Sequence, residues 1–339
     1  MPRPTRSPQK TGTAGRLQLA LAVLSVTLLV AAAGCYLYRG ATVVAVTIWP
    51  PWFWALPGVG LALLSGSRAA GRRTALVLVG WLAAMALLCE EPRALLTCGR
   101  DWPDSGWRAA RERGDAIRVV SLNCAGGSVE AAAEALRYDP DLVLLQESPS
   151  APELRELLAH HAAYGLVWGF DASVIARGSV TPRRVARADR AFVTAAEVKL
   201  SGRRLVVLDT RLVLPYLGTD LWHAAGWRNA REAHGARCEQ LSALARYADA
   251  VPADVPLIVG GDFNTPPGDS LFRLLPPRLH DSFRAAGFGL GNTIINAAPL
   301  SRIDQLWVDE HLVPRAVVAR KTQHSDHRIV ICDVVFRSR

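Results

Sequence analysis

The chain is 339 residues long, with 50% hydrophobic and 20% charged residues, which suits one large or two ordinary domains and excludes disorder along its whole length. Six Cys in a chain of this length also exclude a small disulfide-stabilised scaffold. The net charge of +9 is uneven: residues 1–116 hold 13 Lys and Arg against 6 Asp and Glu, a balance of +7, whereas residues 117–339 hold 26 against 24, a balance of +2. A near-neutral C-terminal region argues against a domain that grips nucleic-acid phosphates.

Three apolar segments without charge open the chain, at residues 17–38, 40–67 and 74–89. A membrane-spanning helix needs roughly 20 apolar residues. The first segment has that length, the second contains three prolines that predict a kink, and the third is short. We therefore predict three transmembrane helices within residues 17–90. The alternatives are a cleaved signal peptide for the first segment and buried core helices for the other two.

The distribution of Arg and Lys predicts the orientation of these helices. Four basic residues and no acidic one lie in residues 1–16, three Arg lie between the second and third segments, and only Arg39 lies between the first and second. Because basic residues favour the cytoplasmic side, the N-terminus is expected in the cytoplasm. Three spans then place residues 117–339 outside the cytoplasm. The charge of +7 on residues 1–116 is explained by the basic residues that set this orientation.

Residues 91–116 mix Pro, Gly and charged residues and are expected to form a juxtamembrane linker. Trp102 and Trp107 are expected to rest at the lipid headgroups, as Trp often does at membrane surfaces. Cys89 and Cys98 would face an oxidising compartment, although their spacing alone does not show that they pair.

From residue 117 onward, short apolar runs rich in β-branched residues alternate with helical patterns, which predicts a single α/β or α+β domain over residues 117–339. The predicted helices cover residues 128–138, with Ser128 as N-cap, 153–163 and 229–250. The predicted strands cover residues 117–125, 141–147, 172–178, 204–212, 255–264, 303–310, 313–320 and 328–336.

Charged and amide side chains stand where several of these apolar strands begin or end. They are Asn123, Glu147, Asp262, Asn264, Asp304, Asp326 and His327. Each could by itself be a turn, cap or solvated residue, but together they are expected at one sheet edge, where α/β folds place ligand sites. Carboxylates gathered there would repel one another unless a cation neutralised them, and oxygen ligands favour Mg²⁺, with Mn²⁺ or Ca²⁺ as alternatives.

The motifs SLNCAG, LLQE, GGDFNTPP, SRIDQLW and HSDHRIV resemble, in order and spacing, those of the endonuclease/exonuclease/phosphatase family. The resemblance covers residues 117–336. It implies a four-layer α/β sandwich, in which two mixed β-sheets are flanked by helices, here preceded by three transmembrane helices. The combination of leading spans and an external domain resembles the membrane-anchored VanJ-type and YafD-like bacterial proteins, which implies a multi-pass protein of the bacterial cytoplasmic (inner) membrane.

The resemblance also implies a metal site. Glu147 would be the principal ligand, with Asn123 beside it and Asp326 assisting. The expected cofactor is Mg²⁺, because a cation offsets the charge that develops during phosphate-ester hydrolysis.

For the chemical step, the resemblance implies that Asp262 orients or deprotonates the attacking water and that Asn264 holds a phosphate oxygen. His327 would bind the scissile phosphate or serve as acid or base, with Asp304 and Asp326 orienting it or helping to bind the metal.

One position departs from the family pattern. Where many members have His in an N-T-H motif, this chain has Asp209, Thr210 and Arg211. Arg211 could contact the substrate phosphate but cannot act as acid or base, and a surface salt bridge is the alternative. His223 and His234 are possible substitutes for the missing His, although surface positions suit them better.

These inferences predict a membrane-anchored, metal-dependent phosphatase or phosphodiesterase. The expected partners are the lipid bilayer and a phosphate ester or pyrophosphate carried by a lipid of the undecaprenyl type, because an anchored domain meets headgroups at high effective concentration. An extracytoplasmic nuclease is the first alternative, disfavoured by the near-neutral charge of residues 117–339. A non-catalytic membrane receptor on this fold is the second.

Overall fold

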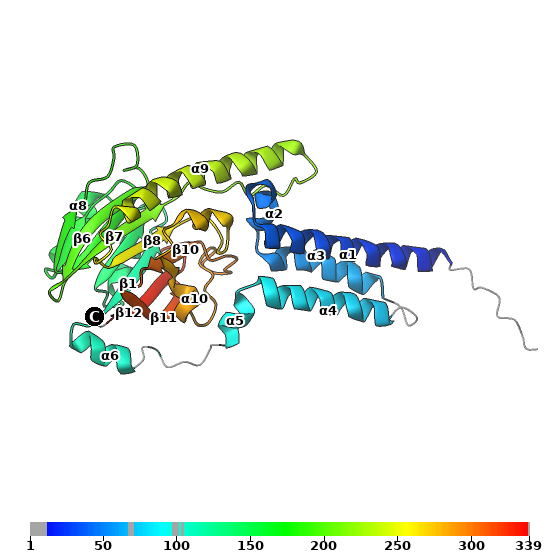
Figure 1. Ribbon diagram of the computed structural model, residues 1–339, viewed down its shortest axis with the longest axis horizontal. Coiled ribbons are helices and arrows are strands. Elements are labelled where there is room, and N and C mark those ends of the chain that lie inside the picture. Colours follow the sequence, from blue (N-terminus) through cyan, green and yellow to red (C-terminus); the bar gives the residue numbers. More distant parts are fainter. Residues whose placement is uncertain (1–11, 67–70, 97–101, 103–104, 338–339) are drawn as a thin grey trace, which may run out of the picture. The chain divides into compact units, whose positions relative to one another are not determined.

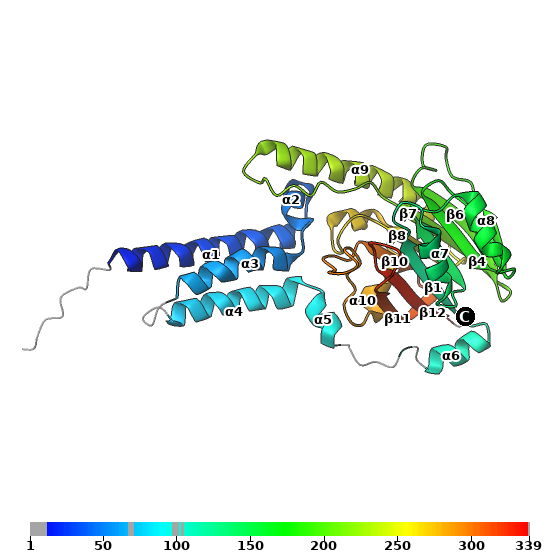
Figure 2. The ribbon, with the colours of Figure 1, turned by 180° about the vertical axis from the view of Figure 1, so that it is seen from behind.

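The computed structural model describes residues 12–66, 71–96, 102 and 105–337. The chain divides into two compact units. The first, called here the helical unit, comprises Met1–Tyr38 and Pro50–Pro92, and the second, the sandwich unit, comprises Arg39–Trp49 and Arg93–Arg339. Figures 1 and 2 show the elements of both units from opposite sides.

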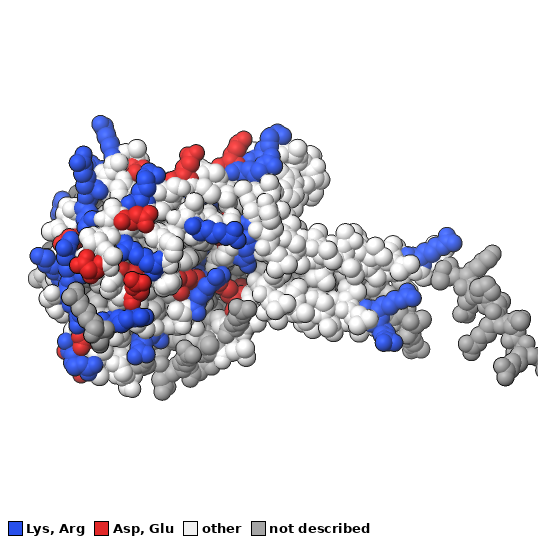
Figure 3. Space-filling model, viewed as in Figure 1, with Lys and Arg blue, Asp and Glu red and all other residues white. Residues whose placement is uncertain are grey.

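Within the part of the helical unit that the structure describes, three long helices are present: α1 (Thr13–Tyr38), α3 (Pro51–Leu64) and α4 (Gly71–Leu88). Helices α1 and α4 are long and apolar enough to cross a membrane. Their exposed large apolar side chains are nearly all Leu and Val. On the face shown in Figure 3 the middle of this unit carries no charged side chain. Helices α1 and α4 begin at the same end of the unit (Figure 1).

The second predicted span, 40–67, is not one helix. The chain forms η1 (Ala41–Val43) and α2 (Val44–Thr47), bends by 65°, and continues as α3. The break lies at Pro50 and Pro51, where Pro50 is the N-cap of α3 and Pro51 occupies its first turn; proline lacks the N–H that a continuous helix needs. Helix α3 alone has 14 residues, so the described residues contain two candidate spans, or three if the bent pair counts as one.

A polar contact joins the three helices of this unit. The hydroxyl of Ser25 donates to the Gly58 carbonyl at 2.6 Å and accepts from Trp81 Nε1 at 3.1 Å, and all three groups are buried. A Cβ at Gly58 would lie 2.0 Å from the Trp81 ring, so this glycine allows α3 and α4 to approach closely.

Two six-stranded mixed sheets form the centre of the sandwich unit. The first has the strand order β11-β12-β1-β2-β4-β3 and the second β5-β6-β7-β8-β10-β9. The β1–β2 and β7–β8 pairs are parallel and all others are antiparallel. The strands are β1 (Ala116–Asn123), β2 (Leu142–Gln146), β3 (Tyr164–Val167), β4 (Ala172–Arg177), β5 (Ser179–Pro182), β6 (Val193–Leu200), β7 (Arg203–Arg211), β8 (Leu257–Asp262), β9 (His280–Asp281), β10 (Asp304–Val308), β11 (Leu312–Arg320) and β12 (Ile329–Phe336).

The sheets pack face to face because their strands are apolar on both sides. Leu144 of the first sheet and Val207 and Leu306 of the second share one buried core cluster. Helices α7 (Val129–Leu136) and α8 (Ala151–Ala159) cover the outer face of the first sheet, and α9 (Ala224–Asp249) with η2 (Ser270–Leu274) covers that of the second. A short α10 (Ser282–Ala286) contacts β10 and β11. The predicted architecture of two mixed sheets flanked by helices is confirmed.

Most predicted elements of this unit are present with boundaries shifted by a few residues, and Ser128 caps α7 by accepting from the Ala131 N–H at 3.1 Å. The sequence interpretation missed β3, β5, β6 and β9. These strands are short or Ala-rich. Three of them lie at a sheet edge and β6 lies beside one, so their hydrophobic signal is weak.

Residues 91–116 are not simply a linker. Helices α5 (Glu91–Leu96) and α6 (Ser105–Glu112) form there, and α6 packs on β1 and β12. Trp107 is buried, and the Arg118 guanidinium lies over the rings of Trp102 and Trp107 at 5.0 and 4.7 Å. The expectation that Trp107 rests at lipid headgroups is therefore wrong, because its ring packs in the sandwich unit. Cys98 lies outside the described residues, so the structure does not test whether it pairs with Cys89.

Candidate active site

Strand register brings the predicted polar residues to one edge of the sandwich. Strands β1 and β2 are parallel and end together, because Asn123 lies opposite Gln146, the residue before Glu147. In the second sheet Asp262 lies opposite Arg211 on one side and Asp304 on the other. The antiparallel β12 begins beside the end of β1, which brings His327 to the same edge. These positions explain why residues from distant strands meet.

Asn123 connects the two sheets at this edge. Its Nδ2 donates to Glu147 Oε1 and to Asp262 Oδ2, both at 3.1 Å. Its Oδ1 accepts from the Ala125 N–H at 2.9 Å, and Glu147 Oε2 accepts from the Gly126 N–H at 2.6 Å. One buried amide therefore holds the proposed metal carboxylate next to the proposed catalytic one.

Two of the site residues have left-handed backbone conformations. The φ angle is +44° at Glu147 and +47° at Asn264. Non-glycine residues rarely adopt such angles, and they persist where surrounding contacts impose them, often at functional sites. The Asn264 side chain is held by its Nδ2, which donates to the Leu212 carbonyl at 2.8 Å and to Asp262 Oδ2 at 3.3 Å.

Asp262, Asp304 and His327 form a buried cluster whose candidate ligand atoms lie within 4.8 Å of one another. His327 Nδ1 and Asp304 Oδ2 are 2.8 Å apart. Burial and the charge of Asp304 raise the pKa of Asp262 to about 7. Burial alone would lower the pKa of His327, but the charges of Asp304 and Asp262 outweigh it and raise the pKa to about 10. The imidazole is therefore held as a cation between carboxylates.

Arg211 binds two acidic residues of the site. Its Nη2 lies 2.8 Å from Glu147 Oε1 and its Nη1 lies 3.1 Å from Asp171 Oδ2. Burial alone would raise the pKa of Glu147, but the hydrogen bond from Asn123 and the charge of Arg211 outweigh it and lower the pKa. The sequence left two interpretations of Arg211, a contact with the substrate phosphate and a surface salt bridge. Arg211 does form a salt bridge, but it lies within the site and is half-buried.

Sequence reasoning missed Asp171, although it directly precedes a predicted strand. Strand β4 is antiparallel to β2, with Ala172 opposite Gln146, so the start of β4 lies beside the end of β2. An acidic residue at the start of an antiparallel strand was therefore a usable signal.

Sequence reasoning also missed two buried polar residues, Gln146 and Asp209, that lie behind the site. Gln146 Nε2 donates to Asp209 Oδ1 at 2.7 Å, and burial raises the pKa of Asp209 well above its ordinary value.

The loop that carries His327 is tied to β1. Ser325 Oγ donates to the Asn123 carbonyl at 2.6 Å and accepts from the His327 N–H at 3.0 Å. Asp326 is exposed, and its charge contributes to the raised pKa of His327.

Neither alternative histidine joins the site. His223 is exposed near Asp220, and His234 is buried with its Nε2 3.0 Å from Asp269 Oδ1. The expectation of a surface position is thus wrong for His234, because α9 turns it toward η2.

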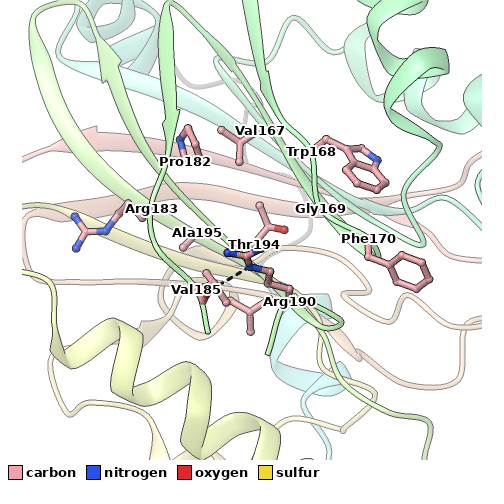
Figure 4. A pocket seen from close by; sticks show the side chains of 11 residues that line it. Val167, Trp168, Gly169, Phe170, Pro182, Arg183, Val185, Arg190, Thr194 and Ala195 are labelled. Atoms are coloured by element: carbon pink, nitrogen blue, oxygen red, sulfur yellow. Dashed lines mark hydrogen bonds between the residues drawn. The ribbon is translucent and has the colours of Figure 1, made fainter. Parts of the chain in front are cut away.

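A cavity of about 450 Å³ lies beside the site, between β3 and the start of β6 (Figure 4). Trp168 and Phe170 line it, together with Arg190 and Thr194. Trp168 Nε1 donates to the carbonyl of Pro149, close after Glu147 in the chain. The wall of this cavity is therefore hydrogen-bonded to the segment that follows Glu147.

The model of the endonuclease/exonuclease/phosphatase family matches residues 120–327, a range that contains every residue of the site described above. The chain belongs to the endonuclease/exonuclease/phosphatase family. Members of this family are phosphoesterases or nucleases that depend on divalent metal ions, so hydrolysis is the expected chemistry of the sandwich unit.

Solved structures agree with the fold of this family. A family protein from Bacteroides vulgatus is 14% identical with a TM-score of 0.53, and the match covers 66% of this chain and 99% of that one. A family protein from Bacteroides thetaiotaomicron is 15% identical with a TM-score of 0.52, covering 66% and 98%. Truncated TDP2 from Caenorhabditis elegans is 17% identical with a TM-score of 0.50, covering 66% and 98%. No protein of curated function matches the chain.

Proposed function

We propose that this protein is a membrane-anchored, metal-dependent phosphohydrolase of the VanJ or YafD type. Its substrate would be a phosphate ester or pyrophosphate on a lipid of the undecaprenyl type, met at the outer face of the bacterial cytoplasmic membrane. The observation that carries the proposal is the site built on Asn123, Glu147 and Asp262, in a chain that also contains α1 and α4, each long and apolar enough to span a bilayer.

The residues of the site fit a divalent cation. Asp304 Oδ1 is buried and has no hydrogen-bond partner among the described residues. Burial, together with the negative charge of Asp304, raises the pKa of Asp262. Glu147 would hold the ion, with Asn123 beside it and Asp326 assisting. The carboxylates of Asp262 and Asp304 also lie close enough to each other to share an ion. When bound, Mg²⁺, Mn²⁺ or Ca²⁺ would offset charge on the carboxylates and on the phosphate oxygens.

The side chains would then act directly on the substrate and on water. Asp262 would orient the attacking water and accept its proton. Asn264 would donate amide hydrogen bonds to a phosphate oxygen, and His327, oriented by Asp304, would place a positive charge against the scissile phosphate. Arg211 would contribute a permanent charge at the same edge, in place of the family's histidine.

The proposed organisation assigns residues 1–16 to the cytoplasm, 17–90 to the membrane helices, 91–116 to the juxtamembrane segment and 117–339 to the external catalytic domain. An alkaline phosphatase reporter fused after Arg339 is expected to be active, and one fused after Arg72 inactive, because this reporter folds only outside the cytoplasm. The reverse pattern would place the site in the cytoplasm and contradict the proposed substrate.

The activity itself is tested with full-length protein in vesicles. With Mg²⁺ present, phosphate release from undecaprenyl diphosphate is expected to exceed the nicking of plasmid DNA, and EDTA should stop the release reversibly. Salt-sensitive cleavage of DNA without phosphate release would identify a nuclease instead. Absence of both activities in a folded protein would favour the non-catalytic receptor.

A further inference from the structure

The sandwich unit exposes large apolar side chains on the loop between β7 and α9, residues 212–223. Val213, Leu214, Leu217 and Trp222 are exposed, with 66% of Leu214 and 78% of Trp222 accessible. Solvent-exposed apolar side chains are common singly, but a group of them on one loop marks an interaction site.

This loop is folded and holds these side chains outward. Tyr216 and Leu221 turn inward and pack against Val44 and Ala45 of the segment that contains α2. The Tyr216 hydroxyl donates to Asp220 Oδ1 at 2.9 Å, and Trp227 Nε1 donates to the Leu221 carbonyl at 2.8 Å. The exposure of Leu217 and Trp222 is therefore a property of an ordered loop.

Two further exposed apolar residues are chain neighbours of groups at the site. Phe170 precedes Asp171, which binds Arg211, and 76% of it is accessible. Ile295 follows Ile294, whose backbone pairs with that of His327. We call Phe170, Val213, Leu214, Leu217, Trp222 and Ile295 the apolar rim. Val213 and Leu214 likewise follow Arg211 closely, so the rim is connected to the site from three segments.

The loop of residues 212–223 packs on a segment of the sandwich unit, residues 39–49, that is joined covalently to α1 and α3. Arg39 follows the last residue of α1 directly, and Pro51 of α3 comes four residues after α2 ends. Four residues reach at most about 14 Å, whichever way the two units are oriented. Arg228 and Arg231 are exposed in the first turns of α9, next to the loop, and suit anionic headgroups.

We propose that the apolar rim inserts into the headgroup and acyl boundary of a phospholipid bilayer, so that the site receives its phosphate group from the membrane surface. The inference rests on the proposed function and adds how the substrate arrives. Large apolar side chains flanked by basic residues are the composition that binds membrane interfaces, and Trp favours that depth. The lipid chain of the substrate would then remain in the bilayer while its phosphate meets Arg211 and His327.

Labelling from the lipid tests the contact without any assay of hydrolysis. Full-length protein in vesicles of phosphatidylglycerol and phosphatidylethanolamine, doped with a diazirine-bearing phospholipid, is irradiated and digested. Lipid adducts are expected on peptides from residues 212–223 as well as on α1 and α4. Adducts on α1 and α4 with none on residues 212–223 would overturn the proposal.

Substitution tests its consequence for catalysis. In Leu214→Asp and Trp222→Asp, the rate on a diphosphate embedded in vesicles, divided by the rate on the same diphosphate with a short water-soluble chain, is expected to fall at least tenfold. Ala163→Asp is the matched control, because Ala163 is exposed just before β3, at the sheet edge opposite the site. Its ratio should equal that of the wild type.

The two measurements separate the two proposals. An unchanged ratio in Leu214→Asp and Trp222→Asp, with the soluble ester still cleaved, would contradict the role of the rim and leave the proposed function standing. Adducts on residues 212–223 in a protein that cleaves neither ester would support the membrane contact and contradict the proposed function. Thermal unfolding of each variant confirms that the fold survives.

Discussion

Glu147→Gln is expected to abolish phosphate release, with a loss of about 10³-fold or more. The substitution keeps the shape of the side chain but removes the charge that would hold the cation, and a bound ion contributes several kcal/mol to the stabilisation of developing charge. It also removes the partner of Arg211 Nη2, 2.8 Å away. The measurement is phosphate release by the full-length protein in Mg²⁺, together with the midpoint of thermal unfolding.

Glu156→Gln is the control for this experiment, because Glu156 is exposed on α8 and a change there removes the same charge without touching the site. The control should keep both activity and stability. Wild-type activity in Glu147→Gln would show that this carboxylate is not a metal ligand. A loss accompanied by unfolding would mean that its bonds to Asn123 and Gly126 are needed for the fold instead.

The second large effect is expected at the pair formed by His327 and Asp304. His327→Ala should lower kcat by about 10²- to 10⁴-fold with little change in KM, because a group that acts on the reacting phosphate contributes mainly in the transition state. Asp304→Asn keeps the imidazole but removes its charged partner at 2.8 Å, so a smaller loss is expected.

The double variant His327→Ala/Asp304→Asn separates two roles of Asp304. If Asp304 only orients His327, the double variant should be no slower than His327→Ala, because residues that act as a unit are not additive. A further large loss would make Asp304 a ligand of the ion. His311→Ala is the control, since His311 Nδ1 lies 3.2 Å from Asp309 Oδ2 in a similar pair in the turn between β10 and β11. Wild-type kcat in His327→Ala would contradict its assigned role.

The pattern of the sequence predicted an α/β or α+β domain with polar residues at the ends of its strands, and the resemblance to the family implied the sandwich of two mixed sheets. Strands such as β2 and β8 are apolar on both faces, which requires cover on both sides and hence a layered fold. Glu147 and Asp262 are polar residues at the carboxyl ends of such strands, where α/β folds place ligand sites. The length of the first apolar segment likewise predicted α1, a helix of 26 residues, because a run of about 20 apolar residues is typical of a membrane-spanning helix.

Only the tertiary structure decided what these residues contact. That Asn123 of one sheet reaches Asp262 of the other, and that Arg211 joins Glu147 to Asp171, depends on how the two sheets pack, and no local pattern encodes such packing. The second apolar segment shows the same limit. Its composition indicated one kinked span, but Val44 and Ala45 pack against the loop before α9, because burial against another part of the chain is as favourable to an apolar residue as burial in lipid. Hydropathy measures how strongly a side chain prefers to leave water. Whether that side chain is then buried against lipid or against another part of the protein depends on the tertiary structure.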